Sequence, residues 1–109
     1  MEIRIEKKSP RAAVLFAQGV IDVTVAPEFR TELLALANDG NKQIIVDLSD
    51  VEVIDSSGLG ALIDGLKAIR KHGGDLRLAS LNAQVASMVE LTNLGGILKV
   101  VDPNGSASE

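Results

Sequence analysis

The sequence predicts an α/β fold, with one domain built on a mixed sheet of about four to five strands and about three to four helices packed against it. Three observations predict this class. Strand-like and helical segments alternate from residue 43 onward, which indicates parallel strands joined by right-handed crossovers. The first two strand-like segments are separated only by a short turn, as in a hairpin, so the sheet is expected to be mixed. A length of 109 residues suits a single hydrophobic core.

Two strands are expected at the N-terminal end of the chain. Isoleucine alternates with charged residues over 2–6, the pattern of a half-buried strand. A second apolar segment covers 13–21 and follows the turn-forming Ser-Pro-Arg of 9–11. We expect the two strands to form an antiparallel hairpin.

A helix and a central strand are expected next. Pro27 falls in the first turn of a segment whose apolar residues have helical spacing, and Asn-Asp-Gly at 38–40 ends it. The segment 43–48 is almost continuously apolar, which is typical of a strand covered on both faces. We therefore expect this strand in the middle of the sheet.

The second half of the chain continues the alternation. The helix after Ser56 has its apolar residues on one face and stops at the glycines of 73–74, where a left-handed C-cap costs little. A strand over 75–79 follows, and then Asn82 is expected to cap a short helix. The apolar residues of 98–101 are expected to close the sheet.

Composition argues against several classes of function. A net charge of −4 and the absence of Trp and Tyr provide neither the basic surface nor the stacking platforms that nucleic-acid binding uses. Residues 1–8 lack the apolar segment of a leader, and no stretch is long and apolar enough to span a membrane. With no cysteine, the chain suits a reducing compartment, and we expect a cytoplasmic protein. The domain is expected to cover 1–102, with a frayed tail at 103–109.

One short segment calls for a functional explanation. Asp-Ser-Ser-Gly-Leu-Gly at 55–60 stands where an apolar strand gives way to an amphipathic helix. Ser56 is expected to be the N-cap, worth about 1 kcal/mol, with Asp55 adding a charge that favours the helix dipole. A cap does not explain the glycines, since each one inside a helix costs up to about 1 kcal/mol relative to alanine. Gly60 and Asp64 fall opposite the apolar face, so we expect the glycines to open a smooth surface for close approach.

Such a helix entrance suits either binding of a phosphorylated ligand or acceptance of a phosphoryl group. A nucleotide-binding P-loop would need a lysine where this helix begins, and none is there. Ser56 has no histidine or lysine close by in sequence to activate it as a nucleophile, and His72, the single histidine, stands at the far end of the helix. We therefore expect no enzymatic activity and no cofactor.

Four spaced motifs agree with one known family. The Asp-Ser-Ser-Gly-Leu-Gly of 55–60 is the most specific, and Gly-Val-Ile-Asp at 19–22, His-Gly-Gly-Asp-Leu at 72–76 and Leu-Gly-Gly-Ile at 94–97 occur in the expected order. Over residues 3–101 the sequence resembles the STAS-domain anti-sigma factor antagonists. The resemblance implies a STAS-type fold and a function in transcription regulation by partner switching.

The resemblance also implies a phosphorylation cycle. Ser56 would be phosphorylated by the partner anti-sigma factor, a serine kinase with a histidine-kinase-like ATPase fold, and a metal-dependent serine phosphatase would reverse the modification. The dephosphorylated protein would bind the anti-sigma factor and release the sigma factor, and phosphorylation would end the binding. Asp22 matches the aspartate that the family places beside the serine.

The residues expected at the partner-binding surface are Asp22, Asp55, Ser57, Gly58, Leu59, Gly60 and Asp64. Two alternatives stay open at this point. Ser57 is the main alternative phosphate acceptor, since it lies one residue further along the chain. The protein is alternatively a STAS module that is not phosphorylated and serves as an interaction subunit of a signalling or lipid-transport complex, in which case Ser56 is only a helix cap.

Overall fold

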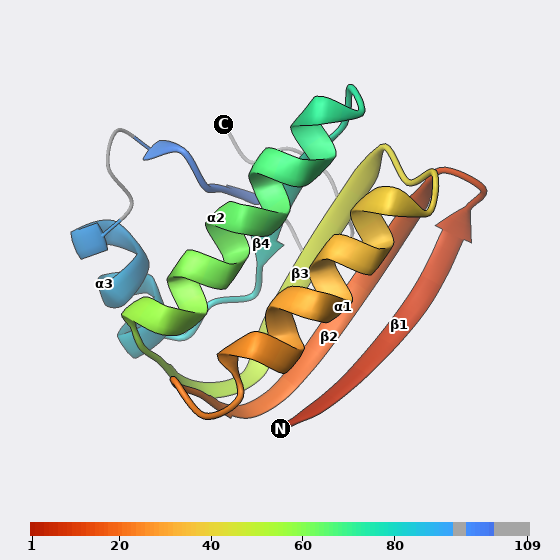
Figure 1. The fold of residues 1–109 in the computed structure, drawn as a ribbon. Helices are drawn as coiled ribbons and strands as arrows, with labels where there is room; N and C mark the ends of the chain where they lie inside the picture. Colours follow the sequence, from red (N-terminus) through yellow and green to blue (C-terminus); the bar gives the residue numbers. More distant parts are fainter. Residues whose placement is uncertain (93–95, 102–109) are drawn as a thin grey trace.

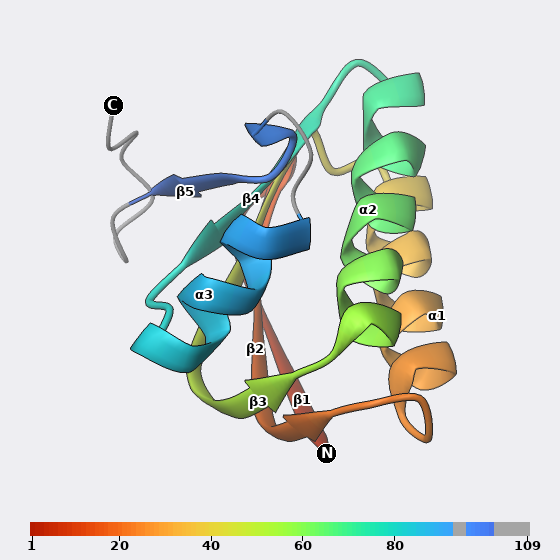
Figure 2. The same cartoon turned by 90° about the vertical axis from the view of Figure 1, so that its left-hand side faces the viewer.

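A computed structural model describes residues 1–92 and 96–101 and shows one sheet with helices packed against one of its faces (Figures 1 and 2). The strands are β1 (Glu2–Ser9), β2 (Ala12–Ile21), β3 (Gln43–Ile54), β4 (Asp75–Ala79) and β5 (Lys99–Val101). The helices in the described ranges are α1 (Ala26–Asn38), α2 (Ser56–Lys71) and α3 (Ala83–Thr92). The predicted α/β class and mixed sheet are confirmed, whereas the tail expected at 103–109 lies outside the described residues.

The strand order is β1-β2-β3-β4-β5, with β3 in the middle as expected. β1 and β2 form the predicted antiparallel hairpin, and β2, β3, β4 and β5 pair in parallel. Parallel neighbours have their carboxyl ends at the same edge of the sheet. The loops that lead from β2 into α1 and from β3 into α2 therefore begin side by side (Figure 1).

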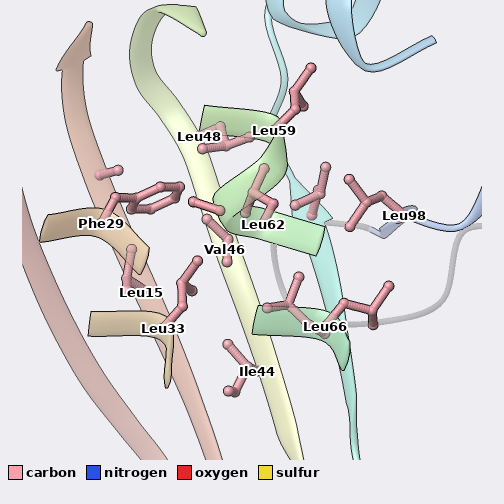
Figure 3. Packing of buried hydrophobic residues seen from close by; sticks show 14 of the residues in the cluster. Leu15, Phe29, Leu33, Ile44, Val46, Leu48, Leu59, Leu62, Leu66 and Leu98 are labelled. Atoms are coloured by element: carbon pink, nitrogen blue, oxygen red, sulfur yellow. The ribbon is translucent and has the colours of Figure 1, made fainter. Parts of the chain in front are cut away.

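The core lies between the sheet and the helices (Figure 3). Alternate residues of β3, namely Ile44, Val46 and Leu48, point toward the helices and are buried. Phe29 of α1 and Leu62 of α2 lie over them and are also buried. This apolar contact holds α1 and α2 at a constant position relative to the strand ends.

The opposite face of the sheet corrects one expectation. Segment 43–48 was expected to be covered on both faces. The buried apolar residues of all three helices, apart from Ala26, belong instead to a single cluster on one face, and Ile45 on the other face is only half-buried. Polar side chains shield the apolar residues of this second face in part; the Arg4 guanidinium lies 4.2 Å from the centre of the Phe16 ring. Residues 1–92 and 96–101 thus form two layers and not three.

The end of α2 and the start of α3 follow the predicted local signals. Gly73 adopts φ +80°, and Gly74 N–H donates to the Ile69 carbonyl at 2.9 Å, which satisfies an acceptor at the helix end. Asn82 Oδ1 accepts a hydrogen bond from Val85 N–H at 2.8 Å and so caps α3. The predicted helix stop and the predicted cap are both confirmed.

Asn82 should contribute to stability through both ends of its side chain. Its Nδ2 also donates to the Val51 carbonyl of β3 at 2.9 Å, so Asn82→Ala removes a cap and leaves a carbonyl without its donor. We expect the free energy of unfolding in urea to fall by about 1–2 kcal/mol. Asn82→Asp keeps the cap but cannot donate, and should fall between wild type and Asn82→Ala. Equal stability of all three proteins would contradict this assignment.

Candidate functional site

The candidate site lies where β2 and β3 end. Asp22 follows β2 directly and Asp55 follows β3 directly. The final residues of the two strands, Ile21 and Ile54, are paired, and Asp55 N–H continues the ladder by donating to the Ile21 carbonyl at 3.0 Å. The loops that hold the two aspartates are therefore fixed beside each other by backbone hydrogen bonds.

Asp55, and not Ser56, caps α2. Its Oδ1 accepts hydrogen bonds from Ser57 N–H at 2.9 Å and from Gly58 N–H at 3.1 Å, and its backbone is extended, as an N-cap requires. The expectation that Ser56 is the cap is wrong, because the preceding carboxylate reaches both amides and leaves Ser56 as the first helical residue. Ser56 is exposed, so its hydroxyl is not needed by the cap and faces solvent.

Asp22 organises the other loop in a similar way. Its Oδ1 accepts a hydrogen bond from Thr24 N–H at 3.0 Å, and its carbonyl accepts from Val25 N–H and Ala26 N–H. This turn leaves Val23 70% exposed at the surface. None of the sequence motifs includes Val23. The signal that could have identified it is an apolar residue in the turn that directly follows a strand.

The glycines of α2 have different environments. Gly60 is exposed, and a Cβ added there would meet nothing within 4 Å. A Cβ on Gly58 would lie 2.6 Å from Ile54 and 2.7 Å from Ile21, and one on Gly65 would lie 3.0 Å from Leu33. The expectation that the glycines of 55–60 open the outer surface is therefore wrong for Gly58. Like Gly65 further along the helix, Gly58 lets α2 pack closely against the core.

Leu59 also faces inward. Its side chain is 2% exposed and lies beside Leu48 and Leu62 in the core (Figure 3). The expected contact between Leu59 and a partner does not fit this burial. Ser57 is half-buried and faces a groove between the helices, so the residues of 55–60 that reach the surface are mainly Ser56 and Gly60.

A groove of about 520 Å³ extends from these residues along the first turns of α1 and α2. The residues that line it include Val23, Arg30, Thr31, Ser57, Gly60 and Asp64. Arg30 Nε and Asp64 Oδ2 form an ion pair of 2.9 Å across it, and both side chains are about half exposed. The groove has an apolar end at Val23 and a charged end at the ion pair.

The surface brings apolar, polar and charged groups together. Within residues 1–92 and 96–101, no cluster of three or more His, Asp or Glu side chains is arranged to hold a metal ion. His72 stands at the C-terminal end of α2, where its Nε2 lies 3.1 Å from Asn38 Oδ1. In the same ranges, no helix has the length and apolar character to cross a membrane. The surface combines an exposed serine, a bare helix turn, an exposed valine and two aspartates.

The site is thus a helix entrance that Asp55 caps and that carries an exposed Ser56, directly after the central strand of a mixed sheet. The STAS domain family model matches residues 4–107, and the chain therefore belongs to the STAS domain family. An anti-sigma-B factor antagonist of Bacillus subtilis is 35% identical over 82 residues, which cover 75% of this chain and 74% of that protein.

Two solved structures of the anti-sigma factor antagonist SpoIIAA have the same fold. The unphosphorylated form aligns with a TM-score of 0.81 at 16% identity and covers 94% of this chain and 90% of that one. The phosphorylated form, from Bacillus, aligns with a TM-score of 0.73 at 15% identity and covers 94% of both chains. The predicted resemblance to the STAS-domain antagonists is thus confirmed at the level of family and fold.

The division of roles between Asp55 and Ser56 is testable by stability alone. Asp55→Ala removes the acceptor of two first-turn amides and should lower the free energy of unfolding by about 1 kcal/mol. Ser56→Ala removes only an exposed hydroxyl and should change it by less than about 0.5 kcal/mol. Urea denaturation of both variants checks this, with Asp55→Asn as a control that keeps an acceptor. A larger loss for Ser56→Ala than for Asp55→Ala would return the cap to Ser56.

Gly58 and Gly60 provide a second matched pair. Gly58→Ala forces a methyl group against Ile54 and Ile21 and should destabilise the fold by about 1–3 kcal/mol. Gly60→Ala meets open space and should stabilise the helix by about 0.5–1 kcal/mol. Thermal unfolding followed by circular dichroism measures both. A destabilised Gly60→Ala protein would show that Gly60 is not open.

Proposed function

We propose that this protein is an anti-sigma factor antagonist whose binding to its partner is switched off by phosphorylation of Ser56. The observation that carries the proposal is the separation of roles at the helix entrance. Asp55 supplies the cap, so Ser56 is exposed and free to be modified without loss of the helix start. The names of related proteins, such as the anti-sigma-B factor antagonist of Bacillus subtilis, support the same class of function.

In the unphosphorylated state the surface offers features that a protein partner can use. Exposed Val23 provides an apolar contact, and bare Gly60 allows a partner backbone to come close to α2. The Arg30–Asp64 pair sits further along the groove, where exposed charges affect partner choice more than affinity. Asp22, Asp55 and Ser57 complete the proposed surface, while Gly58 and Leu59 support it from inside.

A phosphoryl group on Ser56 would change this surface by charge. It adds about −1.5 to −2 charges beside the Asp55 carboxylate and at the same sheet edge as Asp22. The first-turn amides of Ser57 and Gly58 already donate to Asp55, so they are not available to draw the phosphate toward the helix. The phosphate therefore projects outward, repels an acidic partner surface and prevents close approach over Gly60.

The switch needs no change of fold. SpoIIAA, whose fold this chain shares, has been solved in both unphosphorylated and phosphorylated forms, which supports a fold that tolerates the modification. A coupling free energy of about 2–3 kcal/mol between phosphorylation and binding alters affinity by tens to more than a hundredfold. An electrostatic change at the edge of a docking surface is of this order.

The partners follow from the proposed cycle. The anti-sigma factor is a serine kinase with a histidine-kinase-like ATPase fold, and a metal-dependent serine phosphatase restores the binding form. The protein itself acts by binding in the cytoplasm and carries out no catalysis. In this scheme its free, unphosphorylated concentration sets how much sigma factor is released.

The first test is the mass of the protein isolated from its own cells. Part of the population should carry one phosphoryl group on Ser56, located by fragmentation and removed by phosphatase. Ser56→Ala should abolish the modification, and the matched control Ser57→Ala should retain it. Absence of any phosphoryl group under all growth conditions would contradict the proposal and favour the constitutive interaction module.

The second test is binding to the kinase that performs this modification. Ser56→Asp should reduce its affinity for the kinase, in calorimetry, by roughly tenfold or more, because it places a further charge beside Asp55. Ser56→Ala should bind at nearly the wild-type affinity. If Ser56→Asp bound as tightly as the unmodified protein, the electrostatic switch would be excluded.

A further inference from the structure

Strand β1 forms an exposed edge of the sheet. It stands first in the strand order and pairs with β2 through one of its sides. Among the described residues no strand pairs with its other side, which lies at the outer border of the sheet (Figure 1). An edge strand of eight residues presents unpaired N–H and C=O groups that are a template for another strand.

Charges on an edge strand usually prevent such pairing. The order of charges along β1, however, allows two copies of the strand to pair with opposite charges facing each other. Two β1 strands can pair antiparallel with Ile5 of one copy opposite Ile5 of the second copy. In this register the numbers of two opposed residues add up to 10. Arg4 then lies opposite Glu6, and Glu2 lies opposite Lys8, where the pairing of β1 with β2 is irregular. Ile3 lies opposite the aliphatic part of Lys7. Each pairing of two different residues occurs twice, because the arrangement has twofold symmetry.

The neighbouring registers are unfavourable. A shift by two residues in one direction places Glu6 opposite Glu6 and Arg4 opposite Lys8. The same shift in the other direction places Arg4 opposite Arg4 and Glu2 opposite Glu6. A shift by one residue sets the charged face of one strand beside the apolar face of the other. A shift by four residues also sets opposite charges face to face, Glu2 with Arg4 or Glu6 with Lys8, but it pairs only residues 1–5 or 5–9 of each strand. Among the antiparallel registers that pair most of β1, the order of charges therefore favours the one centred on Ile5.

The side chains concerned are available for these contacts. Glu6 forms ion pairs within its own strand, with Lys8 Nζ at 3.0 Å and Arg4 Nη2 at 3.5 Å, and all three side chains are exposed. The hydrogen bond from Lys8, with the nearby charges, lowers the pKa of the Glu6 carboxyl, so it is ionised at neutral pH. Directly opposed residues of an antiparallel pair lie about 4.5–5.5 Å apart, within reach of these long side chains.

We propose that two copies of this protein associate through their β1 strands, antiparallel about Ile5, to form one continuous sheet. The twofold contact lies along β1 at the lateral border of the sheet (Figure 1). Ser56 is the first residue of α2 and follows the carboxyl end of β3. The pairing leaves the Ser56 surface of each copy open. The dimer thus presents the same docking surface twice.

Sedimentation equilibrium of the full chain over a series of concentrations tests the association. We expect a reversible dimer that weakens as salt is raised from about 50 to 500 mM, because exposed ion pairs are screened. Arg4→Glu or Glu6→Arg alone replaces two attractive pairings by two repulsive ones and should weaken the dimer about tenfold or more. The double variant R4E/E6R restores opposite charges and should regain most of the affinity.

A second charge exchange and a control make the result decisive. E2K and K8E should each weaken the dimer and the E2K/K8E double variant should restore it, with Arg4 left in place over Phe16. Glu90→Arg, an exposed charge reversal on α3, should leave it unchanged. Circular dichroism confirms that each variant is folded. A protein that stays monomeric at millimolar concentration, or a dimer indifferent to these single reversals, would overturn the proposal.

Discussion

The parallel pairing of β2 with β3 is the constraint on which the rest of the structure depends. It continues to the last residues of both strands, where Asp55 N–H donates to the Ile21 carbonyl. Because parallel strands need a crossover, α1 is placed over the sheet, and α2 leaves from the same edge beside it. The two loops that carry Asp22 and Asp55 therefore meet at one end of the molecule. The groove between the helices and the exposed Ser56 are consequences of that meeting.

At the helix entrance, six residues serve both the stability of the fold and the surface that we propose is modified. The backbone needs an acceptor at the start of α2, and Asp55 provides it. The core needs a residue without a side chain where α2 meets Ile54 and Ile21, and Gly58 provides it. Ser56 and Gly60 are then left with no structural task, and both face solvent. The cap does not use the Ser56 hydroxyl, which is the condition that the proposed reversible switch requires.

The proposed binding surfaces use different parts of the same sheet. The Ser56 surface is formed by loops at the carboxyl ends of the strands, where side chains from several elements converge. The β1 surface is a lateral edge, where recognition rests on backbone groups and on the order of charges along one strand. Since neither surface contains residues of the other, one association leaves the other available. A small domain of this kind can bind two partners at once, because the loops at the carboxyl ends of its strands and its edge strand form separate surfaces.

The order of elements was readable from the sequence because its signals are local. Alternating isoleucines mark β1, the glycines at 73–74 end α2, and Asn82 caps α3, each through contacts within a few residues. The tertiary structure decided what depends on distant neighbours. Gly58 is buried because Ile21 of another strand lies against it, and Val23 is exposed because a turn directs it away from the core. The choice between Asp55 and Ser56 as the cap depended on backbone geometry at the end of β3, since both residues carry an acceptor that suits the role.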